Sequence, residues 1–122
     1  EYKIFKKLYR KKQGTFRKQL LLLYNNKCAI SNYDASEGLE AAHIDAFSNE
    51  GNNDIDNGII LRSDLHDLFD RQLLKINPDT FKVEIDKSIS NTKYRIYHDV
   101  KINSRTDGEY PNKNFLTTKY DL

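Results

Sequence analysis

The amino-terminal quarter of the chain has apolar residues at helical spacing. Ile4 and Leu8 lie four residues apart among lysines, which predicts a short amphipathic helix that ends at Gly14. Thr15 then stands where a helix N-cap would be expected. A second helical stripe follows at i, i+4, i+7 and i+8, made of Phe16, Leu20, Leu23 and Tyr24. This second helix, with its wide apolar face, is expected to pack against a sheet.

The middle of the chain has short apolar runs that are separated by turn residues. Residues 28–30 form the first run, and residues 39–44 and 58–61 form two more. Each run predicts a strand, because its length and its polar flanks are typical of strands. The segment 45–56 is rich in Asn, Asp and Gly, which predicts an exposed loop between the second and third runs.

A helix is expected directly after the third run. Ser63 is a suitable N-cap, and Asp64 in the first turn favours the helix dipole. His66 and Asp70 are four residues apart, so they share one helix face. The apolar face would consist of Leu65, Leu68 and Phe69.

The remaining chain predicts more β structure. Residues 73–76 and 81–85 are expected to form strands, the second with clear alternation of apolar and polar positions. The turn residues between them, including Pro78, predict a hairpin. A further strand is expected over 94–102, and an irregular tail from 103 onward. The chain is therefore expected to be an α+β protein with one domain over 15–102. This domain would follow a basic arm or linker at 1–14 and precede an irregular tail at 103–122.

Composition narrows the function classes. The 122 residues allow one domain, and the 38% hydrophobic content predicts a small core. No apolar run is long enough to span a membrane. The one cysteine, Cys28, excludes an internal disulfide and a zinc ribbon, so a reducing, cytoplasmic setting is expected and Cys28 is interpreted as a buried thiol rather than a metal ligand. The chain does not begin with Met, which suggests a piece of a longer protein.

The charge is unevenly distributed along the chain. Residues 1–18 carry eight Lys or Arg and one Glu, a net charge of +7. The other residues carry twelve basic and seventeen acidic groups, a net charge of −5. A basic arm beside an acidic body is typical of a phosphate-binding arm next to a metal site, although a solvated linker would have the same composition. The residues expected to bind nucleic acid are Lys6, Lys7, Arg10, Lys11, Lys12 and Arg17.

Four sequence stretches occur together in an order typical of one family. They are FRKQLLLLY at 16–24, CAIS at 28–31, LEAAHI at 39–44 and NGIILRSDLHDLFD at 57–70. In this order they resemble the branch of the HNH endonucleases that carries LEAAHI and NGxxLRxDLHxLFD. The resemblance implies a ββα-metal core, with a helix before it and a β-hairpin after it, and extends over about residues 16–85.

The resemblance also implies roles for individual residues. His43 matches the general base, since a neutral imidazole can take a proton from water. Asn57 matches the Asn whose side chain holds the loop and thereby the base. His66 matches a metal ligand, and its helix spacing makes Asp70 a suitable second ligand. Arg62 lies just before the helix and could clamp a phosphate oxygen.

One position departs from many members of the family. They have Asp or His directly before the general base as a metal ligand, whereas this chain has Ala42. The branch with LEAAHI shares this feature. Strand alternation places Glu40 on the face away from His43, so Glu40 is expected to pair with a basic side chain or a backbone donor.

The metal is expected to be one divalent ion with about two protein ligands. Mg²⁺ or Mn²⁺ suit such sparse ligation, while Zn²⁺ or Ni²⁺ would also accept His66. If Asp70 is not a ligand, Asp45 or Asp67 is the next candidate. Asp67 is the weaker of these, because it lies about 100° around the helix from His66.

The sequence therefore predicts a metal-dependent HNH endonuclease domain that cuts DNA, with RNA left open as a substrate. We expect it to be the nuclease part of a restriction or phage-defence protein, joined to a recognition domain, with a homodimer left open. The alternative is a nucleic-acid-binding module that kept the fold without catalysis. His98-Asp99 could imitate a catalytic dyad, but a surface histidine is the expected role there.

Overall fold

The computed structural model describes residues 2–46 and 53–122, so residues 47–52 of the predicted loop lie outside the described part. The α+β class and the ββα core are confirmed. In chain order the elements are α1 (Tyr2–Leu23), η1 (Ser36–Gly38), β1 (Leu39–His43), η2 (Ile55–Asn57), β2 (Gly58–Arg62), α2 (Ser63–Asp70), β3 (Leu74–Ile76), β4 (Val83–Ile85), α3 (Thr92–Arg95) and α4 (Lys113–Tyr120). No helix within the described ranges is both long and apolar enough to cross a membrane.

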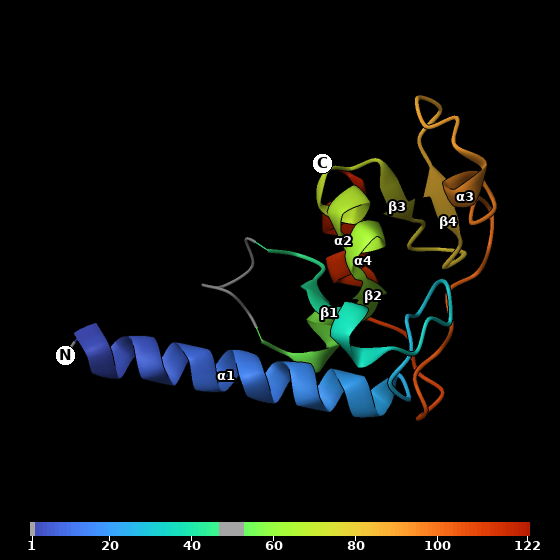
Figure 1. The fold of residues 1–122 in the computed structure, drawn as a ribbon. Coiled ribbons are helices and arrows are strands. Elements are labelled where there is room, and N and C mark those ends of the chain that lie inside the picture. Colours follow the sequence, from blue (N-terminus) through green and yellow to red (C-terminus); the bar gives the residue numbers. More distant parts are fainter. Residues whose placement is uncertain (1, 47–52) are drawn as a thin grey trace.

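Helix α1 is continuous, so the predicted break at Gly14 is wrong. A single Gly costs only about 1 kcal/mol in a helix, and good helix formers flank it on both sides. The Thr15 hydroxyl donates to the Lys11 carbonyl at 3.0 Å, as an interior helix residue does, so it is not an N-cap. Figure 1 shows the amino-terminal half of α1 extending away from the body while its carboxyl-terminal half passes along β1 and β2.

The central unit consists of β1, β2 and α2. The two strands are antiparallel, with Leu39 opposite Arg62 and His43 opposite Gly58. Helices α1 and α2 both contact this strand pair, which explains why the middle of β2 is fully buried. A Cβ atom on Gly58 would lie 2.5 Å from a Leu20 methyl carbon, so glycine allows α1 to approach β2 closely.

Two local predictions around this unit are wrong. Residues 28–30 form a buried turn instead of a strand, although the Ala29 N–H still donates to the Ile60 carbonyl at 2.8 Å. Ser63 is the first residue of α2 and does not cap it; its hydroxyl donates to the Gly38 carbonyl at 3.2 Å. In both places a bond to a distant segment replaces the local structure that the sequence favoured.

The second unit consists of the hairpin β3–β4 and helix α3. The hairpin is confirmed, with Leu74 opposite Ile85. The strand expected over 94–102 is wrong: α3 ends within this stretch, turns follow, and the segment joins the hairpin through an isolated bridge from Lys101 to Lys82.

The expectation of an irregular tail over 103–122 is also wrong. Helix α4 forms there and contacts β3. The Asn112 side chain caps it by accepting from the Asn114 N–H at 2.7 Å, and Leu116 is buried in the core. The tail is therefore an integral part of the fold.

Candidate active site

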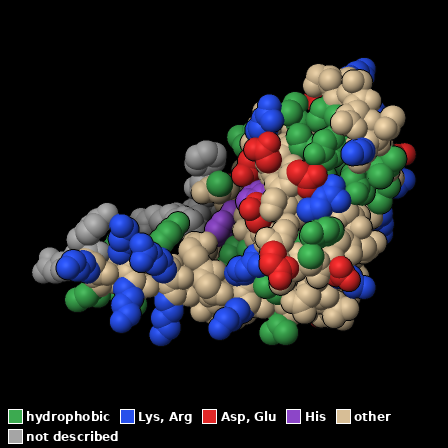
Figure 2. Space-filling model, in the orientation of Figure 1, with side chains coloured by type: hydrophobic (Ala, Val, Ile, Leu, Met, Phe, Trp, Pro, Cys, Tyr) green, Lys and Arg blue, Asp and Glu red, His purple; other side chains and the backbone are tan. Residues whose placement is uncertain are grey.

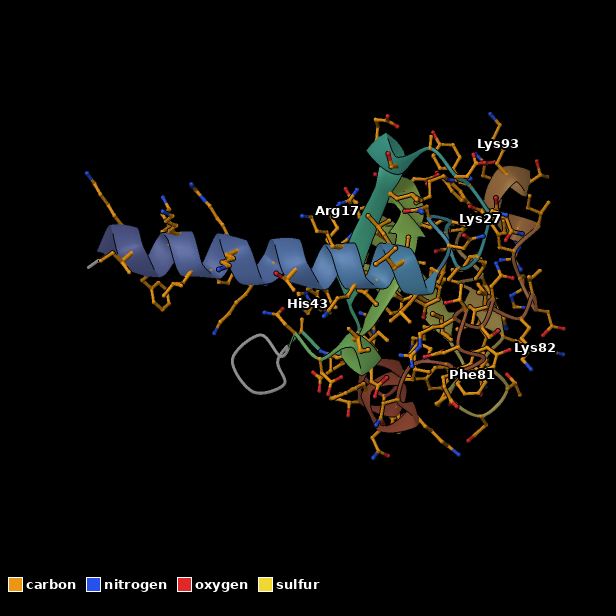
Figure 3. The ribbon with its side chains drawn as sticks, turned by 90° about the horizontal axis from the view of Figure 1, so that it is seen from below. Arg17, Lys27, His43, Phe81, Lys82 and Lys93 are labelled. Atoms are coloured by element: carbon orange, nitrogen blue, oxygen red, sulfur yellow. The ribbon has the colours of Figure 1, made fainter. Side chains whose placement is uncertain are left out.

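His43 lies at the end of β1, where α1 crosses it (Figure 3). The Phe16 ring stacks on its imidazole with centroids 4.5 Å apart and planes 6° apart. The His43 Nε2 atom is 2.9 Å from Asn53 Oδ1, which also accepts from the Gln13 side chain at 3.2 Å. The tautomer with its proton on Nε2 satisfies this contact and leaves the lone pair on Nδ1.

Asn57 is fully buried at the end of η2 and fixes the residues that follow His43. Its Oδ1 accepts from the Asp45 N–H at 2.8 Å, and its Nδ2 donates to the Asp45 carbonyl at 3.0 Å. Asp45 is two residues beyond His43. This geometry is the loop-holding contact that the sequence analysis expected of Asn57.

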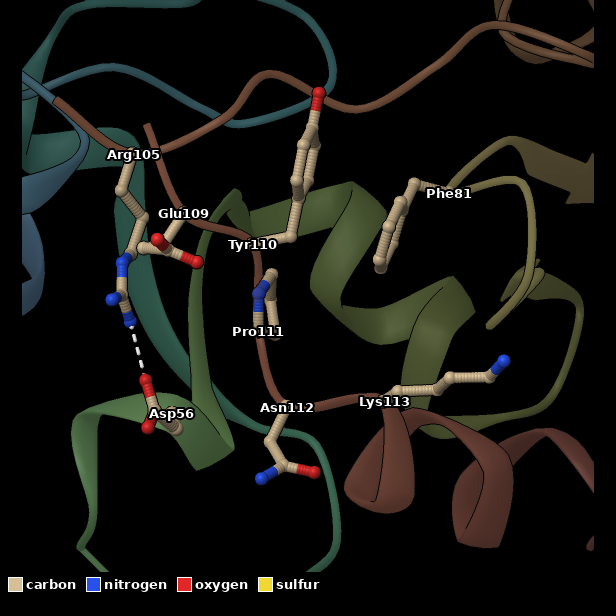
Figure 4. Close-up of a pocket in the computed structure, with 8 residues that line it drawn as sticks. All are labelled: Asp56, Phe81, Arg105, Glu109, Tyr110, Pro111, Asn112 and Lys113. Carbon is tan, nitrogen blue, oxygen red and sulfur yellow. Dashed lines mark hydrogen bonds and ion pairs between the residues drawn. The ribbon is translucent and has the colours of Figure 1, made fainter. Parts of the chain in front are cut away.

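The turn that carries Asn57 is anchored by a residue that the sequence analysis missed. Arg105, whose side chain is only 6% exposed, donates to Asp56 at 2.7 Å (Figure 4). It also donates to Asp107 at 2.9 Å. The Asn112 N–H also donates to the Asp56 carbonyl at 3.0 Å. No short-range pattern could identify Arg105, because its partner Asp56 lies 49 residues away.

His66 lies between two carboxylates. Its Nδ1 is 2.7 Å from Glu40 Oε1, and its Nε2 is 3.2 Å from Asp70 Oδ2. The shared helix face of His66 and Asp70 is thus confirmed. Two ligand atoms bound to one ion at about 2.1 Å and near right angles lie about 3 Å apart, so Nε2 and Oδ2 fit a common divalent ion.

Glu40 was expected to pair with a basic side chain, and its partner is His66 itself. Strand alternation does place Glu40 on the face of β1 away from His43. Helix α2 lies on that face, and its His66 contacts the Glu40 carboxylate. Glu40 shares its face with Ala42, the position at which many members of the family have a metal ligand. One feature of the sequence could have indicated this contact. Helix α2 begins directly after β2, so α2 has to pack on one face of the strand pair, where its side chains can reach Glu40.

Arg62 is already paired. Its Nε donates to Asp64 Oδ1 at 2.6 Å and its Nη2 to Oδ2 at 3.1 Å, while Nη1 donates to the Tyr97 hydroxyl at 3.3 Å. Partial burial opposes ionisation of Asp64, but hydrogen bonds from Arg62 and Tyr94 hold its pKa below the ordinary carboxyl value. A phosphate oxygen would have to compete with Asp64 for the guanidinium.

The basic residues divide into two groups. Lys/Arg side chains gather along the extended half of α1, and histidines are visible where this helix meets the body, near acidic side chains (Figure 2). The five predicted nucleic-acid contacts on this half are exposed: Lys6, Lys7, Arg10, Lys11 and Lys12. Arg17 instead donates to the Leu39 carbonyl at 2.6 Å and the Ser36 carbonyl at 3.1 Å, so it also holds the start of β1.

Other candidate residues have structural contacts. His98 is exposed and its Nδ1 accepts from the Ile85 N–H at 3.0 Å, as expected for a surface histidine. Asp67 pairs with Arg71 at 3.3 Å. The buried Cys28 sulfur accepts from the N–H groups of Ile30 and Ser31. Across the part of the chain that the structure describes, no three His, Cys, Asp or Glu residues form a group that could hold a metal.

Comparison with known proteins finds a family match over this site. Residues 28–77 match the family model described as HNH endonuclease, and this segment contains β1, β2, α2 and β3. No curated protein matches the chain. HNH nucleases act on DNA and generally depend on a divalent metal. This segment holds His43, Asn57 and His66 in the expected order, so the match supports the resemblance to the HNH endonucleases over residues 28–77.

Proposed function

We propose that the protein is a metal-dependent endonuclease that hydrolyses DNA phosphodiester bonds, with His43 as its general base. The observation that carries this proposal is the environment of His43. Stacking on Phe16 and the contact with Asn53 hold the ring in one plane and one tautomer. A base held this way needs little reorganisation before it accepts a proton.

His43 would take a proton from water on Nδ1, because Nε2–H is directed at Asn53. The water oxygen then bonds to phosphorus as the bond from phosphorus to the leaving sugar oxygen breaks. Asn57 fixes the backbone two residues after His43 and so keeps the base at the same place through the reaction. Arg62 would contact a phosphate oxygen by exchanging its Asp64 partner.

His66 and Asp70 are the proposed metal ligands. A divalent ion at this site supplies charge neutralisation on the phosphate and stabilises the leaving oxygen. One imidazole nitrogen and one carboxylate oxygen suit Mn²⁺ or Mg²⁺, with Zn²⁺ and Ni²⁺ as further candidates. The two protein ligands leave room in the coordination shell for water and phosphate.

The basic arm, residues 1–14, is proposed to bind the DNA backbone near this site. Its lysines are exposed on a helix that contacts β1, the strand carrying His43. A role in restriction or phage defence, cytoplasmic location and attachment to a recognition domain are proposed on family analogy.

Plasmid cleavage tests the proposal. The wild type should nick or linearise plasmid with Mn²⁺ or Mg²⁺, and His43→Ala should reduce the rate about 100- to 10,000-fold, as expected when a general base is lost. His98→Ala is the matched control, since His98 is a surface histidine outside the site, and it should cut at the wild-type rate.

Two results would contradict the proposal. Cleavage by His43→Ala within a few-fold of wild type would remove His43 as the base. A wild type that binds DNA but does not cut it with Mg²⁺, Mn²⁺, Zn²⁺ or Ni²⁺ would support a non-catalytic nucleic-acid-binding module instead.

A further inference from the structure

The two carboxylates beside His66 contact different nitrogens of its ring. Glu40 reaches Nδ1 from β1, and Asp70 reaches Nε2 from the next turn of α2. The two lone-pair directions of an imidazole diverge widely, so one ion cannot bind both nitrogens. If His66 binds an ion, one carboxylate would therefore share that ion with it, while the other would orient the ring.

The two distances decide which carboxylate has which role. The Glu40 contact, 2.7 Å, is the length of a charge-assisted hydrogen bond from N–H to a carboxylate. The Asp70 contact, 3.2 Å, is longer than such a bond but matches the separation of two atoms that bind the same ion. These distances therefore favour the Nε2 edge of the ring as the side on which His66 and Asp70 would hold an ion.

We propose that Glu40 is a positioning residue for His66: its carboxylate accepts the Nδ1–H and so presents the Nε2 lone pair, together with Asp70, to a divalent cation. This inference rests on the metal site proposed above. A carboxylate on the second nitrogen fixes the tautomer and the ring orientation of a metal-binding histidine and makes the bound nitrogen more basic.

The position of Glu40 adds a second effect. Glu40 and His66 are 26 residues apart and come from the strand pair and the helix, so their bond spans the packing between β1 and α2. The Glu40 side chain is 47% exposed and that of His66 is 22% exposed, so their contact is partly open to solvent and lies outside the buried core. Loss of Glu40 should therefore weaken metal binding more than it weakens the fold.

Metal titration is the first test. Calorimetry with Mn²⁺ should show about 10- to 100-fold weaker binding for Glu40→Ala, the usual loss when a supporting carboxylate is removed. Glu40→Gln should lose less, because its amide oxygen still accepts the Nδ1–H. Glu37→Ala, at an exposed glutamate three residues earlier, is the matched control and should bind Mn²⁺ as the wild type does.

Nitrogen NMR of the wild type is the second test, and it requires no variant to fold. With diamagnetic Zn²⁺ as the probe, the ¹⁵N shifts of His66 should show Nε2 bound to the metal and Nδ1 protonated. Binding of Zn²⁺ through Nδ1 would overturn the inference, and so would unchanged Mn²⁺ affinity in Glu40→Ala.

His66→Ala separates this inference from the proposed function. If His66→Ala binds Mn²⁺ as tightly as the wild type, the proposed metal site is wrong and the role of Glu40 falls with it. If His66→Ala loses Mn²⁺ binding while Glu40→Ala retains it, the metal site stands and only the positioning role of Glu40 is overturned.

Discussion

The described part of the chain contains the order strand, strand, helix twice, and the first of these two units carries the proposed chemistry. The first unit is β1–β2–α2, and the second is β3–β4–α3. Each has an antiparallel strand pair, and each has a histidine on or just after its helix. His66 in the first unit faces two carboxylates, whereas His98 in the second accepts a hydrogen bond from the Ile85 backbone.

Helix length is one physical difference between the units. Helix α2 has eight residues, so it can place His66 and Asp70 one turn apart on one face. Helix α3 has four residues and cannot hold an i, i+4 pair. The order of elements alone therefore does not make a metal site; the helix must extend at least one further turn.

The connections between the strands are the other difference. In the second unit, Asn77 accepts from the N–H groups of Asp79 and Thr80, which stabilises its own turn. In the first unit, Asn57 reaches twelve residues back to Asp45. The same kind of side-chain bond thus closes a short turn in one unit and fixes the residues that follow β1 in the other.

The largest effect is expected on stability, when the Asn57 side chain is removed. Asn57→Ala should lower the free energy of unfolding by about 2–4 kcal/mol, because two buried hydrogen bonds to Asp45 are removed. Asn77→Ala, which removes the bonds to the exposed turn residues Asp79 and Thr80, should cost about 1 kcal/mol. Urea unfolding measures both. Equal losses would show that Asn57 is no more than a turn residue.

A smaller effect is expected on DNA affinity, since α1 contacts the first unit. Replacing Lys7, Lys11 and Lys12 with Gln should weaken DNA binding and lower the salt slope of log Kd by about 0.9 for each phosphate that no longer has a lysine partner. The matched control replaces three exposed lysines of the second unit with Gln: Lys82, Lys87 and Lys93. Binding titrations at several salt concentrations compare the two.

The control triple variant should keep both the affinity and the slope of the wild type. If the two triple variants lose affinity equally, DNA binding follows total charge instead of the position of the basic arm. If neither variant changes Kd, the arm is a linker, and the DNA-binding role proposed for it is wrong.

The smallest effect concerns the contact between the units. Asp64 accepts from Arg62 in the first unit and from the Tyr94 hydroxyl in the second. Its pKa is lowered on folding, so its stabilisation is present above the ordinary carboxyl pKa of 3.8 and is lost as the pH falls through the lower folded value. Asp64→Asn should cost about 1 kcal/mol or less near neutral pH, because the pair is partly exposed.

The pH dependence provides the check on Asp64. Unfolding of the wild type and Asp64→Asn should differ most above pH 5 and converge below the ordinary carboxyl pKa. A difference that stays constant down to strong acid would show that the carboxylate charge contributes nothing.

The parts of the fold that the sequence predicted correctly are those with strong local signals. The apolar runs at β1 and β2 and the alternation at β3–β4 were sufficient to place these strands. The helical stripe through Phe16 and Leu20 likewise identified the buried face of α1. Each of these signals arises from residues within one element, so no distant contact was needed to interpret it.

The wrong or missing predictions depend on competition between weak local preferences and distant contacts. Gly14 disfavours a helix by an amount that its neighbours easily offset. The signal for α4 was present in the Asn112 cap, but the buried position of Leu116 depends on contacts with the rest of the fold. The partner of Glu40 and the role of Arg105 were missed, because the partners of these residues are 26 and 49 residues away.

Because α1 is continuous, it determines which part of a bound DNA the basic arm would contact. At about 1.5 Å per residue, the nine steps from Lys3 to Lys12 extend about 14 Å, close to four base pairs. Phe16 joins this rod directly to His43. A flexible arm could place its lysines on the DNA at either side of the cleaved bond. A continuous helix keeps these lysines at a fixed distance and direction from His43. The DNA protected by the basic arm should therefore lie on one flank of the cleaved bond, at a constant offset.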